Sequence, residues 1–171
     1  MESALKLARV IDRISERFGK VVAWLCFPLV LALVYEVTAR YGFKAPTEWA
    51  YDVTYMLYGT IFMLGAAFTL LKKGHIRTDF FYINWSPKRQ GKTDTIMYVL
   101  FYFPAIIFFL GAGWDYAAHS WETFERAAMS PWRPIIYPFK AVIPVTAFLL
   151  LVQGVSELIK SVHAWKRGEW V

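Results

Sequence analysis

The sequence predicts an all-α integral membrane protein with four transmembrane helices and an N-terminal amphipathic helix at the membrane interface. Of its 171 residues, 57% are apolar and only 19% are charged, and the charges gather between apolar runs rather than within them. One run, Val53 to Leu71, has no charge, and as a helix of about 28 Å it matches a hydrocarbon core of about 30 Å. Four such spans leave no room for a soluble catalytic domain, so we expect one membrane domain over residues 1–171 and no enzyme activity.

The first part of the chain predicts a surface helix followed by a span. Residues 3–18 place apolar side chains at helical spacing and basic ones opposite, which is typical of an amphipathic helix lying on the inner leaflet. The first span is predicted over 21–41, with a kink at Pro28. A cleaved signal peptide is the alternative, but the long charged leader favours a retained span. Glu36 and Arg40 are one turn apart, so they form a local ion pair or contact a partner.

The second span is predicted over 51–71. Thr47 is the expected N-cap, and Glu48 and Asp52 lie near the start of the helix, where the helix dipole favours anions. We expect Gly74 to end this helix in a left-handed conformation. Beyond it, Arg77 and Asp79 are placed to pair with each other or with a partner at the membrane surface.

The third span is predicted over 95–114, but its helical pattern continues further. A single helix from Asp94 to Met129 would be about 54 Å long, so it must tilt, bend at Pro104 or protrude from the membrane. The fourth span is predicted over 139–162, after the helix-breaking segment 130–134.

The distribution of cations predicts the orientation of the spans. Fourteen Lys and Arg residues lie in the terminal segments and the connection between spans two and three, and five lie in the other two connections. Because cations collect on the cytoplasmic side, we expect both termini in the cytoplasm. The net charge of +6 is explained by these flanking cations, so nucleic-acid binding is not expected.

Few residues suggest cofactor or transport chemistry. Cys26 is the single cysteine, which excludes a disulfide framework, and no metal-ligand cluster or other cofactor site is expected. Three histidines (His75, His119 and His163) raise the alternative of a haem-binding redox anchor; His119 falls at the opposite membrane face, which leaves His75 with His163. Without acidic pairs at mid-depth, a stand-alone channel is disfavoured.

Small residues within the spans allow helices to approach closely. Gly59 and Gly65 lie in span two, and Gly111 and Gly113 lie in span three. They serve packing within this bundle or packing against a larger subunit.

Several motifs together resemble a known family. They are Thr47-Glu48-Trp49 before span two, Gly65-Ala66 within it, Gly74-His75-Ile76-Arg77-Thr78-Asp79 after it, and Ser130-Pro131-Trp132 before span four. In this order, over about residues 15 to 160, they resemble the small membrane subunit of tripartite ATP-independent periplasmic (TRAP) transporters, the DctQ-like family. The adjacent acidic doublet of that family is replaced here by Glu48 and Asp52, one turn apart.

The resemblance implies a transporter of the bacterial inner membrane with three components. A periplasmic DctP-like protein captures an organic acid, a large DctM-like subunit moves it by an elevator motion coupled to sodium, and the small subunit enlarges the fixed scaffold. The substrate stays open among carboxylates, keto acids and sulfonates. The alternative function is a membrane anchor of a redox complex.

Charged residues at the helix ends are the candidates for contacts with these partners, which include membrane lipid. The predicted interface residues are Glu36, Arg40, Glu48, Asp52, Arg77, Asp79, Glu125 and Arg126. Charges in the connections 42–52 and 115–134 are expected to dock the binding protein, or else to cap helices and meet lipid headgroups.

Overall fold

The computed structural model describes residues 2–74, 82–128 and 130–170 and confirms an all-α protein over these ranges. The helices are α1 (Glu2–Ala23), α2 (Cys26–Val37), α3 (Ala50–Leu71), α5 (Pro87–Met97), α6 (Phe103–Glu122), α7 (Tyr137–Lys140) and α8 (Val142–Arg167). Short π-helical turns, Thr38–Gly42 and Tyr98–Tyr102, extend α2 and join α5 to α6. Four continuous segments are long and apolar enough to cross a membrane: Glu2–Gly42, Ala50–Leu71, Pro87–Glu122 and Tyr137–Arg167.

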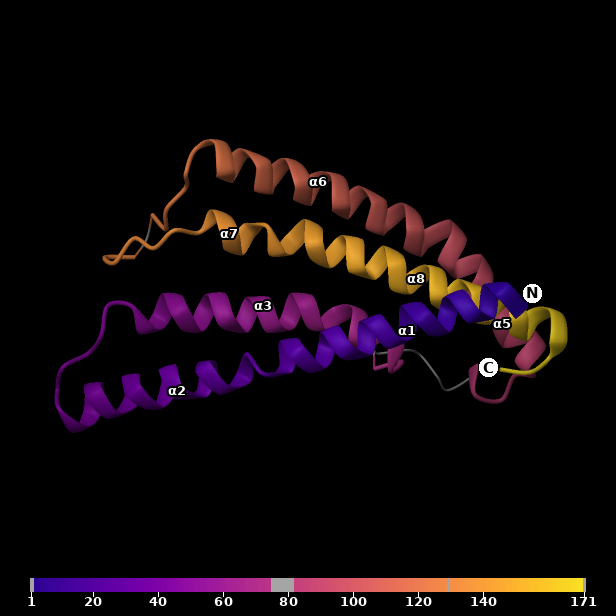
Figure 1. The fold of residues 1–171 in the computed structure, drawn as a ribbon, viewed down its shortest axis with the longest axis horizontal. Coiled ribbons are helices and arrows are strands. Elements are labelled where there is room, and N and C mark those ends of the chain that lie inside the picture. The colour runs from indigo at the N-terminus through magenta and orange to yellow at the C-terminus, as the bar shows by residue number, and fades with distance from the viewer. Residues whose placement is uncertain (1, 75–81, 129, 171) are drawn as a thin grey trace.

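The helices form an elongated bundle with two distinct ends (Figure 1). Both termini lie at one end, which we call the terminal end. The connections 43–49 and 123–136 lie at the opposite end, which we call the hairpin end. The two termini therefore share one end, as the prediction that both lie on one side of the membrane requires; which side that is stays a prediction.

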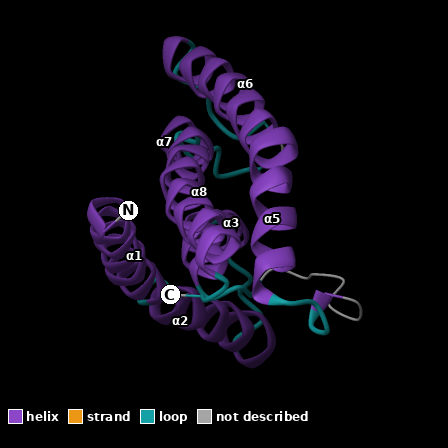
Figure 2. Ribbon diagram, turned by 90° about the vertical axis from the view of Figure 1, so that its right-hand side faces the viewer, coloured by secondary structure: helices purple, strands orange, loops and turns teal. Residues whose placement is uncertain are grey.

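The last helix, α8, occupies the centre of the bundle (Figure 2). It packs against α1, α3, α5 and α6. Its buried face consists of small and polar residues, among them Ala147, Gly154 and Ser161. Small side chains let helix backbones approach closely where no hydrophobic force drives them together, which explains why this helix can have neighbours on several sides.

Glycines mark the close crossings between helices. A Cβ on Gly91 of α5 would lie 2.5 Å from the backbone nitrogen of Trp165, and one on Gly154 would lie 2.4 Å from the ring of Tyr102. The side chains of Phe139 and Ile143 likewise occupy the space where a Cβ on Gly59 and Gly113 would lie. Nothing lies within 4 Å of a Cβ built on Gly65 or Gly111. Of the four glycines predicted to pack, two therefore serve this bundle and two face open space.

The amphipathic helix predicted over 3–18 is present as α1 and extends to Ala23. One face is buried, with Ala8, Ile11 and Ser15, and packs against α8 and α3. The helix continues almost in line with α2 (Figure 1), so it is part of the bundle and not a separate surface element. Its position on the inner leaflet stays a prediction.

Two prolines alter the spanning helices. Because Pro28 has no N–H to donate to Trp24, the amide of Phe27 donates to that carbonyl instead (3.1 Å), and the helix is interrupted at residues 24–25, before the predicted kink. The π-helical turn at 98–102 precedes Pro104. The third spanning segment extends beyond the predicted span 95–114 but ends at Glu122, short of Met129.

Non-glycine residues in the left-handed conformation follow three helix ends, at Lys44, Lys73 and Phe124. Lys73 has φ 53°, and the amide of Gly74 donates to the carbonyl of Thr69 at 2.9 Å. The prediction that Gly74 itself adopts this conformation is wrong. Phe124, with φ 48°, ends α6 in the same way, which is why the third helix stops before the apolar pattern does.

Adding one methyl group at the α5–α8 crossing should destabilise the bundle. A Gly91→Ala Cβ would meet the carbonyl oxygen of Ser161 at 2.6 Å as well as the amide of Trp165, and neither backbone atom can move alone. We expect a loss of about 1–3 kcal/mol, measured by thermal unfolding of the detergent-purified protein. Gly111→Ala is the matched control and should be neutral or stabilising, since its Cβ has open space. Equal melting temperatures for the two variants would contradict this packing.

Candidate functional site at the hairpin end

One carboxylate, that of Glu36, holds the connection between α2 and α3 to the end of α2. Glu36 accepts a hydrogen bond from Arg40 Nε (2.8 Å), from the backbone amide of Thr47 (3.0 Å) and from the hydroxyl of Thr47. The predicted Glu36–Arg40 ion pair is therefore present. Thr47 is not the N-cap of α3, which is Trp49, because its side chain is already bonded to Glu36.

Asp52 connects the start of α3 to the second connection of the hairpin end. It lies in the first turn of α3, as predicted, and its side chain is buried. Ser130 donates its hydroxyl to Asp52, and the same Ser130 oxygen accepts the amide of Trp132 at 3.2 Å. The Ser130-Pro131-Trp132 motif is thus tied to span two.

Residues 125–128 and 130–136, which we call the 125–136 hairpin, are held to the bundle by a lysine. Backbone bonds join Ala127 to Pro134 (3.0 Å) and Ile136 to Glu125 (3.1 Å). The carboxylate of Glu125 lies 2.5 Å from Lys140 Nζ, which also stands 4.0 Å from the ring centroid of Tyr116. Because Lys140 is buried, Glu125 serves as its counter-ion.

The predicted interface residues therefore divide into two groups. Glu36, Asp52 and Glu125 make internal contacts, and Arg40 pairs with Glu36. Two others, Glu48 and Arg126, are exposed; Arg126 makes a weak bond to the carbonyl of Arg133 (3.3 Å). Arg77 and Asp79 lie outside the described residues. The exposed charges that remain at this end are Lys44, Glu48, Glu122, Arg126 and Arg133.

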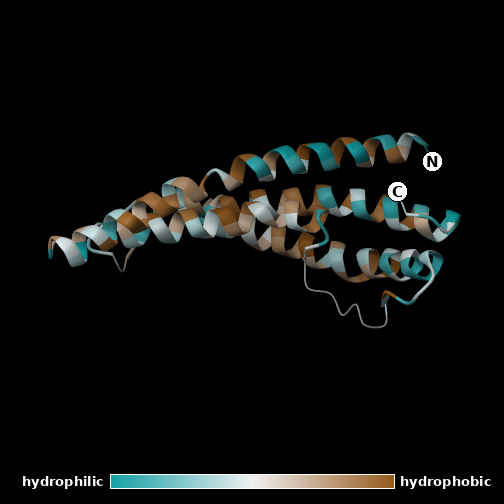
Figure 3. Cartoon of the chain, turned by 90° about the horizontal axis from the view of Figure 1, so that it is seen from below, coloured by the Kyte–Doolittle hydropathy of each residue, from teal (hydrophilic) through white to brown (hydrophobic). Residues whose placement is uncertain are grey.

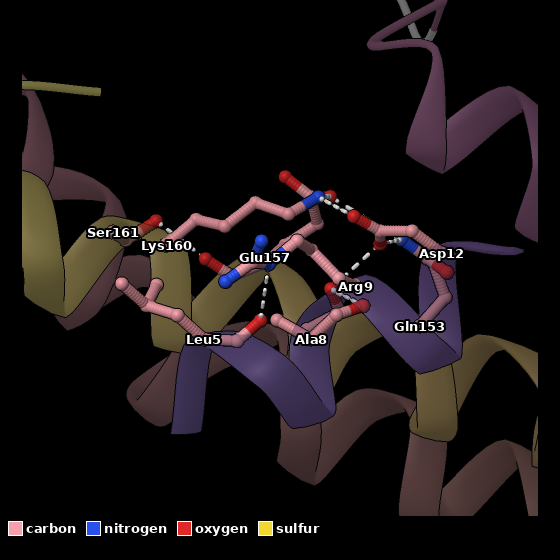
Figure 4. Close-up of polar contacts among 9 residues, drawn as sticks. Leu5, Ala8, Arg9, Asp12, Gln153, Glu157, Lys160 and Ser161 are labelled. Carbon is pink, nitrogen blue, oxygen red and sulfur yellow. Dashed lines mark hydrogen bonds and ion pairs between the residues drawn. The ribbon is translucent and has the colours of Figure 1, made fainter. Parts of the chain in front are cut away.

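A buried polar cluster at the terminal end was not predicted (Figure 4). Asp12 of α1 lies 2.8 Å from Lys160 Nζ, which is also 2.6 Å from Glu157 of α8. Gln153 donates to Asp12 at 3.0 Å, and Ser156 donates to it at 2.7 Å. The spacing of 153, 156, 157 and 160 on one face of α8 is the sequence signal that could have indicated it.

The cluster has the composition of a structural clamp. Two carboxylates share one ammonium group; the Ser156 hydroxyl and the Gln153 amide both donate to Oδ1 of Asp12, and the same amide donates to Oε1 of Glu157 at 3.3 Å. The alternative haem pair, His75 with His163, is not tested, because His75 lies outside the described residues; His163 contacts the carbonyl of Glu169 at 3.2 Å. Among the described residues no group of His, Cys, Asp and Glu side chains has the arrangement of a metal site.

The Glu125–Lys140 pair should make stability depend on pH. The ammonium group holds the pKa of Glu125 below its ordinary value of 4.5, so the unfolded chain takes up this proton more readily than the folded one. The stabilisation from the Glu125–Lys140 pair is fully present above the ordinary pKa of 4.5, and it is lost as the pH falls through the lowered pKa of Glu125 in the folded protein. Wild type should be more stable than Glu125→Gln at pH 7, and the difference in melting temperature should close as the pH is lowered towards 3.

Glu48→Gln, which removes an exposed carboxylate of the same end, is the control for this measurement, and its melting temperature should stay closer to that of wild type than the melting temperature of Glu125→Gln does. A gap between wild type and Glu125→Gln that stays constant from pH 7 to pH 3 would show that the pair does not contribute.

Comparison with known proteins assigns the family. No curated protein matches this chain. A family model for the DctQ component of tripartite ATP-independent periplasmic transporters matches residues 29–164, from α2 to the last turn of α8. That range contains the whole hairpin end and all four apolar segments in full or in part. The family match does not favour the redox-anchor alternative, since the DctQ family consists of transporter components. The chain belongs to the DctQ family and is a small membrane subunit of a TRAP transporter.

Proposed function

We propose that this subunit is the stationary part of a sodium-coupled importer of organic acids, and that its hairpin end docks the periplasmic binding protein. The observation that carries the proposal is the hairpin end itself. Its acidic side chains tie α2, α3 and the 125–136 hairpin to one another, while a second set of charges stays exposed. Such an arrangement combines a rigid platform with a polar contact surface.

The membrane-facing surface supports a scaffold role. In the most apolar stretch of each of the first three spanning segments, only 6–11% of the residues are buried within the described chain, whereas 39% are buried in the last segment. Large side chains such as Tyr51, Phe62 and Phe108 are exposed on α3 and α6. A surface of this kind needs lipid or a large membrane partner to cover it, and the large TRAP subunit is such a partner. Gly65 and Gly111 would let its helices approach closely.

The exposed charges at the hairpin end suit a partner that binds and leaves in every cycle. Both signs are present, in Lys44, Arg126 and Arg133 and in Glu48 and Glu122. Charges at the rim of an interface govern the association rate and its salt dependence more than the final affinity. Arg126 and Glu48 are the better candidates for docking, because Glu125 is already the counter-ion of Lys140.

The proposal requires the hairpin end to face the periplasm, and labelling can test this. Single cysteines would be introduced in a Cys26→Ser background as Ala45→Cys, Ala128→Cys, Lys88→Cys and Gly168→Cys. The first two should react with an impermeant maleimide added outside, and the last two should react only after the membrane is opened, because the larger share of cations lies at the terminal end. The reverse pattern would place the docking surface in the cytoplasm and end the proposal.

Uptake into proteoliposomes that contain both membrane subunits tests the docking role. Glu48→Lys and Arg126→Glu should each raise the binding-protein concentration for half-maximal uptake roughly two- to tenfold, and added salt should do the same to wild type. The two membrane subunits should still copurify. Lys6→Glu, an exposed charge at the terminal end, is the control and should not alter this concentration.

The same vesicles test the coupling ion. Uptake of a carboxylate, keto acid or sulfonate should require an inward sodium gradient and collapse when the gradient is removed. In the docking experiment, if neither Glu48→Lys nor Arg126→Glu changes the binding-protein concentration for half-maximal uptake, the large subunit carries the contact with the binding protein. Transport that proceeds equally without sodium would refute the coupling while leaving the scaffold role intact.

A further inference from the structure

A shallow groove lies where α1 passes into α2. It has an open volume of about 440 Å³ and is lined by Lys20, Ala23, Trp24, Cys26, Phe27 and Val30. The groove follows from the interruption of the helix before Pro28, which leaves Trp24 outside the regular hydrogen-bond pattern. The Trp24 side chain is 76% exposed, so nothing within the described chain covers this surface.

We propose that this groove binds one anionic phospholipid, with its phosphate at Lys20 and an acyl chain along Trp24, Phe27 and Val30. Lys20 is the one charged residue of the lining, and the other five side chains are apolar. Lys20 and Val30 are ten residues apart, so the groove runs about 15 Å along the helix axis. A cation at one end and apolar walls over the rest match an amphiphile with a negative head and a hydrocarbon tail.

A row of cations leads into the charged end of the groove. Lys6, Arg9, Arg13, Arg17 and Lys20 follow one another at intervals of three or four residues, and Trp24 and Phe27 continue the same intervals. Residues at this spacing share one face of a helix. All five cations are exposed, and α1 alternates between hydrophilic and hydrophobic turns along its length (Figure 3). The basic face of α1 therefore ends at the apolar groove.

The local acid does not neutralise this surface. Lys20 Nζ lies 3.2 Å from Glu16, but the lysine side chain is 69% exposed, and exposed pairs of this kind contribute little. Glu16 is shared with Lys72, 3.5 Å away, and Arg17 adds a further cation. One carboxylate shared by two lysines, with the exposed Arg17 next to it in the sequence, leaves the entrance positively charged, which favours an anionic headgroup over a zwitterionic one.

The single cysteine of the chain provides a direct readout, because Cys26 lines the groove and is exposed. The two membrane subunits, purified together and stripped of lipid, would be treated with N-ethylmaleimide, and modification of Cys26 would be followed by mass spectrometry of this chain. Phosphatidylglycerol should slow the modification of Cys26 about five times more than phosphatidylcholine does at the same concentration. This is the ratio expected for one cation at an anionic headgroup.

Variants separate the two halves of the site. Lys20→Gln should remove the preference for phosphatidylglycerol, and Lys44→Gln, an exposed cation of the hairpin end, should keep it. Trp24→Ala should weaken protection by phosphatidylglycerol, while substitution of another exposed tryptophan, Trp114→Ala on α6 (65% exposed against 76%), should not. Folding of each variant is checked by recovery of the two-subunit complex.

Three results would overturn the assignment. Equal protection by the two lipids would make the groove an ordinary lipid contact. Protection of Cys26 in the lipid-free complex would show that the large subunit covers it. Retained preference in Lys20→Gln would place the headgroup elsewhere. None of these results bears on sodium coupling or on docking of the binding protein, so this inference and the proposed function fail independently.

Discussion

The structure depends on the polar contact between α1 and α8. Asp12 and Glu157 share the ammonium group of Lys160, and Gln153 and Ser156 complete the hydrogen bonds of Asp12. Removing α1 would leave Lys160 of the central helix with Glu157 as its one carboxylate among those of this cluster, and the loss of one partner from a buried charged group is costly. Because α1 is fixed in this way, the direction of its basic face and the place of the α1–α2 groove are fixed with it.

The hairpin end is constrained by the same kind of contact, with a different consequence. Each link joins two parts of this end: Glu36 of α2 to Thr47 of the first connection, Asp52 of α3 to Ser130 of the second connection, and Glu125 to Lys140 of α7. These links use Glu36, Asp52 and Glu125, for which the sequence leaves open a contact with a partner or a structural role. In the stationary role that we propose for this subunit, connections held together by side-chain bonds would resist displacement better than free loops do. The exposed charges that remain sit on this stiffened base.

The features that the sequence predicted correctly are those that depend on residues close together in the chain. The four spans, the Glu36–Arg40 pair at i,i+4 spacing and Asp52 in the first turn all follow from short-range rules. Thr47 failed as a cap because a carboxylate eleven residues earlier competes for it. The α1–α8 cluster was missed because Asp12 and Ser156 are 144 residues apart. The helix ends at Lys73 and Phe124 lack the glycine that usually signals them.

The distribution of small residues shows how such a chain divides its surface. Where this bundle closes on itself, glycines meet backbone or rings, as Gly91 meets Trp165 and Gly154 meets Tyr102. Gly65 and Gly111 have the same residue type but no neighbour. In lipid, apolar surface alone gives no reason for two helices to associate, so shape at such positions decides which faces pair. In the proposed complex, Gly65 and Gly111 would therefore be positions for close packing in the membrane, and the exposed charges of the hairpin end would be available to the binding protein.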